Sequence, residues 1–181
     1  MKNALLIAAL LSVGPVLADT NPAPTITPPP TPDELKQPRP PRARGINTEL
    51  AIEAAVAANA ACAANNYKTT ALITDSAGVP IVLISNDGAA AITQRIAMSK
   101  AQATLKYGIS SGEVAAKAAA DTAFAAEVKA NPLIGTARRG ALPIKAGSEQ
   151  IGTFAVSGAP GGDKDEACAL AGLAKIQSRI K

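Results

Sequence analysis

Hydrophobic and small residues recur with two different periods along the chain, and the change of period predicts helices alternating with strands. The strand-like runs are rich in β-branched residues and fall in two pairs, each pair divided by a short polar turn. These pairs are 69–74 with 79–85, and 140–145 with 150–157. Hairpins separated by helices indicate an antiparallel sheet with helices packed on it.

Five helices are predicted around the two hairpins. Alanine dominates the first, Asn47 or Thr48 can cap it, and a face of small residues would allow close packing. The last helix carries a more apolar stripe. The predicted helices span 47–66, 89–106, 110–120, 121–130 and 163–180. The small face of the first helix is Ala51, Ala55, Ala58 and Cys62. The apolar stripe of the last helix is Ala169, Leu173, Ile176 and Ile180.

The helix predicted at 89–106 has apolar residues on two nearly opposite sides. One side must cover the sheet, and the other is left for a further helix, a ligand or another subunit. The first side holds Ile92, Ile96, Ala103 and Tyr107, and the second holds Met98, Ala101 and Leu105.

The amino-terminal part divides into two segments of distinct composition. Residues 1–18 have a positive start at Lys2, an apolar run and a small-residue cleavage site, which is typical of a secretory signal. The run is too short to span a bilayer as an anchor, which takes roughly 20 residues. Residues 19–45 are proline-rich and predict an extended spacer, or alternatively a docking segment for a partner. We therefore expect an exported, periplasmic or secreted protein without a membrane span, folded over residues 46–181.

Composition removes several classes of chemistry. The chain has no histidine, so it cannot build a serine–histidine or cysteine–histidine catalytic unit, and two cysteines are too few for a zinc site. The net charge of +4 is dispersed and aromatic residues are scarce, which argues against nucleic-acid binding. No pair of carboxylates is spaced for acid–base work, so we expect no metal site and no catalysis of its own.

Cys62 and Cys168 are the only cysteines. An even number of cysteines in an exported chain favours a disulfide, and antiparallel packing of the first and last helices would bring these two together. Two free buried thiols, or a redox or metal role, are the alternatives.

The glycine-rich sequence 158–162 precedes the last helix. Such a loop can bind phosphate, but Asp163, Asp165 and Glu166 follow it in the first turn, where they complement the helix dipole and would repel a phosphate. We therefore interpret the loop as a structural turn with a helix cap.

Several short motifs in a fixed order resemble the GlcG/HbpS-like family, which includes the carboxy-terminal domain of PduO-type proteins. The resemblance covers residues from about 46 to the carboxyl terminus. The motifs are TDSAG at 74–78, IAMSKA at 96–101, YG at 107–108, GALPI at 140–144, IGTFAVSG at 151–158 and GGDKDEA at 161–167.

The resemblance implies an α/β (α+β) profilin-like fold with a five-stranded antiparallel sheet flanked by helices. The fifth strand would lie near 133–139. It also implies a homo-oligomer, for which Met98, Ala101 and Leu105 are interface candidates, and it implies haem as a ligand. Without histidine, the candidate haem-binding residues are Tyr107, Met98 and Tyr67.

The sequence thus predicts an exported oligomeric protein that binds a small hydrophobic or tetrapyrrole ligand, with haem first. A ligand-free structural or sensory module is the first alternative, and it predicts a dry interface without a cavity around Met98 and Leu105. An accessory enzyme of glycolate or propanediol metabolism is the second, and it requires a cavity with a perturbed carboxylate or lysine.

Overall fold

The computed structural model describes residues 28–29, 31 and 43–181. The expected signal segment 1–18 and most of the proline-rich segment 19–45 lie outside these residues. The chain divides into two units, 1–40 and 41–181, and the second contains all the helices and strands described below. No helix in the described part of the chain is long and apolar enough to cross a membrane.

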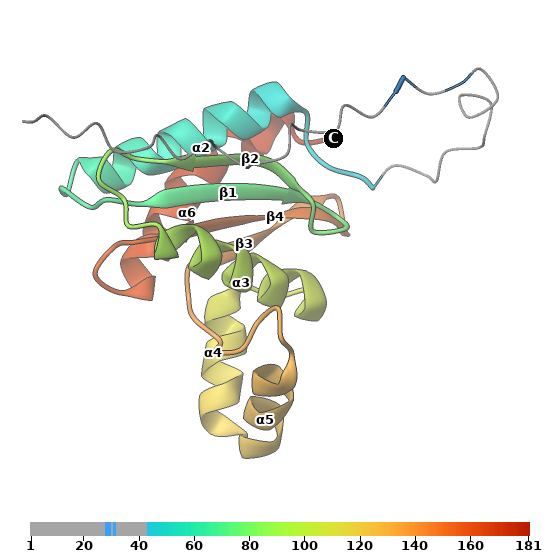
Figure 1. Ribbon diagram of the computed structural model, residues 1–181, viewed down its shortest axis with the longest axis vertical. Coiled ribbons are helices and arrows are strands. Elements are labelled where there is room, and N and C mark those ends of the chain that lie inside the picture. Colours follow the sequence, from blue (N-terminus) through green and yellow to red (C-terminus); the bar gives the residue numbers. More distant parts are fainter. Residues whose placement is uncertain (1–27, 30, 32–42) are drawn as a thin grey trace, which may run out of the picture. The chain divides into compact units, whose positions relative to one another are not determined.

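Four strands form one antiparallel sheet in the order β2-β1-β4-β3. The strands β1 and β4 are central, while β2 and β3 form the two edges (Figure 1). The elements between and around them follow the predicted order. The strands are β1 (Thr70–Asp75), β2 (Pro80–Ser85), β3 (Ala141–Ala146) and β4 (Glu149–Ser157), and the helices are α2 (Thr48–Ala63), α3 (Ile92–Tyr107), α4 (Ser111–Ala120), α5 (Thr122–Ala130) and α6 (Gly162–Ile176).

The predicted fifth strand is absent from the described residues, and 133–139 form turns instead. The side chain of Asn131 accepts a hydrogen bond from the amide of Leu133 at 2.9 Å. The carbonyl of Asn131 accepts from the amides of Ile134 and Gly135 at 3.1 and 2.8 Å. These amides therefore cannot donate to a strand ladder.

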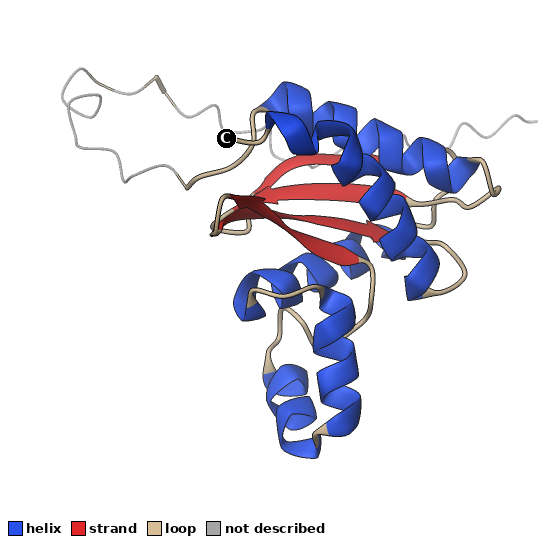
Figure 2. Cartoon of the chain, turned by 180° about the vertical axis from the view of Figure 1, so that it is seen from behind, coloured by secondary structure: helices blue, strands red, loops and turns tan. Residues whose placement is uncertain are grey.

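One face of the sheet is covered by α2 and α6 (Figure 2). Ile73 and Phe154, which are paired across β1 and β4, point into this layer and are fully buried. The predicted small face of α2 allows the close approach of the helices, since Ala51, Ala55, Ala58 and Cys62 are fully buried. At Gly172 of α6, a Cβ would lie 2.5 Å from the carbonyl oxygen of Ala54, so the two helices require glycine here.

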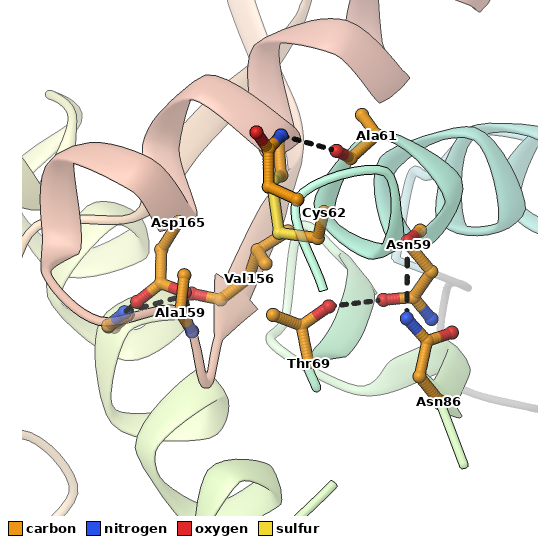
Figure 3. Close-up of a disulfide and its surroundings, with 11 residues drawn as sticks. Asn59, Ala61, Cys62, Thr69, Asn86, Val156, Ala159 and Asp165 are labelled. Atoms are coloured by element: carbon orange, nitrogen blue, oxygen red, sulfur yellow. Dashed lines mark hydrogen bonds and ion pairs between the residues drawn. A yellow bond between two sulfur atoms is a disulfide. The ribbon is translucent and has the colours of Figure 1, made fainter. Parts of the chain in front are cut away.

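The predicted disulfide joins Cys62 of α2 to Cys168 of α6, with the two Cα atoms 5.6 Å apart (Figure 3). It closes a separation of 106 residues. Beside it, Asn59 is buried and accepts a hydrogen bond from the Thr69 hydroxyl at 3.0 Å. This link ties the carboxy-terminal half of α2 to the start of β1. The last helix ends at Ile176, followed by a short 3-10 turn, Gln177–Arg179.

The other face of the sheet is covered by α3, and its composition differs from the expected one. The sheet-facing residues are mainly small and hydroxyl-bearing, and Ala101 of the second predicted stripe is one of them. Thr93 hydrogen-bonds Thr70 of β1 at 2.7 Å, and Ala97 and Ala101 pack against Leu72. Ala101 is 2% exposed, which corrects its assignment to an outward interface.

The helices α4 and α5 pack beside α3 around a small apolar cluster that contains Val114, Phe124 and Val128. The predicted start of α4 is confirmed, since Ser110 and Glu113 form a reciprocal capping box. Asp121 caps α5 by accepting from the amides of Ala123 and Phe124. This arrangement places the turns 131–139 next to the amino-terminal half of α3.

Candidate functional site

Two neighbouring cavities lie along α3. The first, here called the α3 groove, is about 550 Å³ and lies between α3 and the turns at 132–138. Its lining is mainly apolar and includes two arginines and a methionine. Its lining includes Ile92, Arg95, Ile96, Met98, Leu133 and Arg138.

The second cavity, here called the loop pocket, is about 600 Å³ and has more charged side chains in its lining than the α3 groove. It lies where α3 meets the glycine-rich loop before α6. Its lining contains Lys100, Arg138, Arg139, Asp163 and Asp165, together with the hydroxyls of Thr93 and Ser157. Ile96 and Arg138 line both cavities, so the two are adjacent. Both volumes fall in the range of small-molecule sites, roughly 300–1,000 Å³.

A buried ion pair forms the inner wall of the loop pocket. Nζ of Lys100 donates to Oδ2 of Asp165 at 2.6 Å and to the carbonyl of Val156 at 2.9 Å. The other carboxylate oxygen of Asp165 accepts from the amide of Ala159 at 2.9 Å. Lys100 therefore connects α3 to the end of β4. Asp165 connects Lys100 to the glycine-rich loop (Figure 3 shows Asp165, Val156 and Ala159).

Burial governs the ionisation of this pair. Desolvation lowers the pKa of Lys100 below its usual value, although the attraction of Asp165 opposes this, and the positive charge of Arg138 lowers it further. Desolvation likewise raises the pKa of Asp165, against the attraction of Lys100. Both shifts result from placing charges where water is scarce.

Gly140 provides the space for this pair. It has a positive φ of +127°, and a Cβ there would lie 2.7 Å from Nζ of Lys100 and 2.8 Å from Cβ of Asp165. A side chain at position 140 would therefore both strain the backbone and collide with the pair.

Sequence reasoning did not single out Lys100 or Asp165 as site residues. A signal for Lys100 existed, because it lies three residues after Ala97 and four before Thr104 on the sheet-facing side of α3. A lone lysine among small residues on a buried helical face indicates an internal partner. Asp165 had no such signal, since acids in a first helical turn are commonly explained by the helix dipole.

The three predicted haem candidates lie in different places. Met98 is partly buried and lines the α3 groove. Tyr67 lies on the other side of the sheet, in a cavity of about 330 Å³ beside Cys168. Tyr107 stacks edge-on against Phe124, with ring centres 5.0 Å apart, and its hydroxyl donates to Glu127 at 3.0 Å. The structure does not bring these three side chains together in one cavity.

The interface candidates also separate. Met98 and Leu105 are partly exposed, whereas Ala101 is covered by the sheet. Within the described part of the chain, no group of histidine, cysteine, aspartate or glutamate side chains is arranged to hold a metal ion.

The fold and the sequence define a family. The chain belongs to the HbpS-like family, described as haem-degrading protein HbpS-like, whose family model matches residues 46–174. No curated protein matches the sequence.

Solved structures support this assignment. A crystal structure of HbpS has a TM-score of 0.68 and 27% identity, covering 75% of this chain and 93% of its own. A double mutant of HbpS from Streptomyces reticuli has a TM-score of 0.68 and 25% identity, covering 86% and 99%. A complex of PduOC with haem has a TM-score of 0.63 and 15% identity, covering 72% and 94%, and at that identity it shows the fold alone.

Proposed function

We propose that this protein binds haem, or a closely related apolar ligand with acidic groups, in the α3 groove. The observation that carries the proposal is the lining of this groove, which combines Ile92, Ile96 and Leu133 with the charged ends of Arg95 and Arg138. Ile92 and Leu133 are 44% and 63% exposed, so the groove presents apolar surface that a ligand would cover. Membership of a family described by haem chemistry supports the same ligand.

The groove offers clear partners for the macrocycle and the acidic side chains of haem, and fewer for its iron. The apolar side chains suit the macrocycle, and the two arginines suit its acidic side chains. For the iron, Met98 alone of the three candidates lines the groove. Methionine is a known haem ligand, in cytochromes opposite a histidine, which this chain lacks. Met98 would therefore contact the macrocycle or hold the iron through sulfur, and Tyr67 and Tyr107 would have no part in this site.

The test is a haemin titration of the protein followed by absorbance, with gel filtration to separate retained ligand. We expect a saturable shift of the Soret band. Met98→Leu keeps most of the apolar volume and removes the sulfur, whereas Met98→Ala removes both. If sulfur holds the iron, Met98→Leu changes the position of the Soret band while retaining ligand. A protein that neither shifts the band nor retains haemin would refute the proposal.

Catalysis is the second candidate function, and two observations favour it. The matched family is described as haem-degrading. In addition, the loop pocket contains the buried lysine and carboxylate that an enzyme of small acids would require. The haemin complex, mixed with a reductant in air, would lose its Soret band over time if the protein promotes degradation. The same mixture with free haemin is the control.

A ligand-free structural or sensory module is less well supported. It predicts no cavity around Met98, yet Met98 lines a groove of about 550 Å³. Self-association and export remain parts of our proposal, the first resting on the family resemblance and the second on residues 1–18. Light scattering of the protein without residues 1–18 would measure the first, and fractionation of cells expressing the full chain would measure the second.

A further inference from the structure

The amino group of Lys100 has an unused hydrogen-bond donor at the loop pocket. A protonated lysine has three N–H groups. Within the described residues, two of them are used, by Asp165 and by the carbonyl of Val156. Lys100 is 2% exposed and lines the pocket, so bulk water reaches it poorly. An acceptor inside the pocket would complete its hydrogen bonding.

Arg138 lines the loop pocket together with Lys100. It forms no ion pair within the part of the chain that the structure describes, and its one hydrogen bond is a long contact, 3.4 Å, to the carbonyl of Thr136. Arg139, in contrast, faces Glu166 at 3.7 Å. The positive charge of Arg138 acts unfavourably on the ammonium of Lys100. A negative group between them would relieve this repulsion.

We propose that the loop pocket is a binding site for a single carboxylate group, held between Lys100 and Arg138. The ligand carboxylate accepts a hydrogen bond from the third N–H group of Lys100 and forms an ion pair with the guanidinium of Arg138. This inference goes beyond the haem proposal, because it requires only an acid and stands whether or not haem binds.

The charges and the walls of the pocket define the ligand class. Lys100 pairs with Asp165 and Arg139 faces Glu166, which leaves Arg138 as the lining cation without an ion pair among the described residues. A monoanion balances that one charge, whereas a doubly charged phosphate would face the carboxylates of Asp163 and Asp165 unfavourably. Ile96, Ala115 and Ala137 supply an apolar wall for a short alkyl chain. A short-chain carboxylate fits both features.

The first experiment titrates the protein with sodium propionate and follows backbone amide signals by NMR at constant ionic strength. Propionamide is the neutral control of nearly the same shape. We expect saturable shifts confined to Ser157–Gly162 and Arg138 with propionate and none with propionamide. Equal shifts with both compounds, or no saturable shifts, would overturn the proposal.

Two matched arginine variants then test the site. Arg138→Gln removes the charge but keeps much of the length and the hydrogen-bonding capacity, and we expect it to weaken propionate binding about tenfold. Arg95→Gln is the control, since Arg95 lines the α3 groove but not the loop pocket. It should leave propionate affinity unchanged. Unchanged affinity in Arg138→Gln would also overturn the proposal.

A final comparison identifies the source of the carboxylate. If the bound carboxylate is part of a ligand in the α3 groove, haemin should compete with propionate, and haemin dimethyl ester, whose carboxylates are blocked, should not. If the bound carboxylate comes from a free acid, haemin and propionate should bind at the same time. Either result supports the site. If haemin does not bind at all, only the proposed function fails, since the propionate titration does not depend on it.

Discussion

The two faces of the sheet are built from the same strands but differ in chemistry. Residues of β1 and β4 that face α2 and α6 are mostly apolar and fully buried, including Ile73, Phe154 and Val156. Residues that face α3 are largely hydroxyl-bearing, and Thr74 bonds Thr153 across the two strands at 2.7 Å. Among the residues that the structure describes, only the second face has an internal ion pair and the two adjacent cavities along α3.

This difference separates stability from ligand binding. The α2–α6 side combines apolar burial with a disulfide, and its buried Asn59 is hydrogen-bonded to Thr69. The α3 side has small residues, so the helix lies close to the sheet, and its charged and hydroxyl groups fix their neighbours by hydrogen bonds. Changes on the first side should therefore affect unfolding, and changes on the second should affect both unfolding and binding.

Removal of the disulfide should have the largest effect on stability. Because it closes a separation of 106 residues, Cys62→Ser with Cys168→Ser should lower the free energy of unfolding by about 4–5 kcal/mol. Urea unfolding with and without reductant measures the loss. The double serine variant should not respond to reductant. Where it is still folded, its propionate affinity should match the original, and a large loss of affinity would contradict the separation of roles.

Breaking the buried pair should come next. Lys100→Met leaves the carboxylate of Asp165 without its cation, which should cost about 3–5 kcal/mol in the free energy of unfolding. Adding Asp165→Asn removes the buried charge while an amide oxygen can still accept from Ala159. The double variant should therefore unfold less readily than Lys100→Met alone. Strictly additive losses in urea unfolding would show that the two side chains are not coupled.

A methyl group at the α2–α6 contact should have a smaller effect. Gly172→Ala places a Cβ 2.5 Å from the carbonyl oxygen of Ala54 and close to the ring of Phe154, so the helices must separate. We expect this to lower the free energy of unfolding by about 1–3 kcal/mol. Ala171→Ser changes the exposed neighbouring position and should alter the free energy of unfolding by less than about 0.5 kcal/mol. A Gly172→Ala variant more stable than the original protein in thermal unfolding would contradict the close approach of α2 and α6 at Gly172.

Much of the fold could be predicted from the sequence, because the local signals agreed with one another. The hairpin at 75–78, the capping box at Ser110 and the small face of α2 each depend on neighbouring residues. The predicted fifth strand was wrong because Asn131 binds the amides that a strand would need. That hydrogen bonding depends on a turn conformation that residue periodicity does not encode.

The candidate site was less predictable, since it is assembled from distant parts of the chain. Lys100 and Asp165 are 65 residues apart and meet only when α3 and α6 pack at the end of β4. The two stripes predicted on α3 followed its large apolar residues, whereas Thr93, Ala97 and Thr104 occupy the buried side. Apolar periodicity misses a helix that approaches a sheet through small and hydroxyl side chains.

The smallest predicted effect concerns the capping box of α4, which lies apart from both faces of the sheet. The Ser110 side chain and the Ser110 backbone amide, which donates to the carboxylate of Glu113 at 2.8 Å, lower the pKa of Glu113 below the ordinary value of 4.5. The folded chain therefore holds this proton less readily than the unfolded chain. The stabilising contribution of Glu113 is present above the ordinary pKa and is lost as the pH falls through the lowered pKa of the folded protein. Glu113→Gln should destabilise the protein modestly at neutral pH and should lose that difference in acid, as measured by urea unfolding at both pH values. A difference that persisted in acid would mean that the charge of Glu113 is not what stabilises the cap.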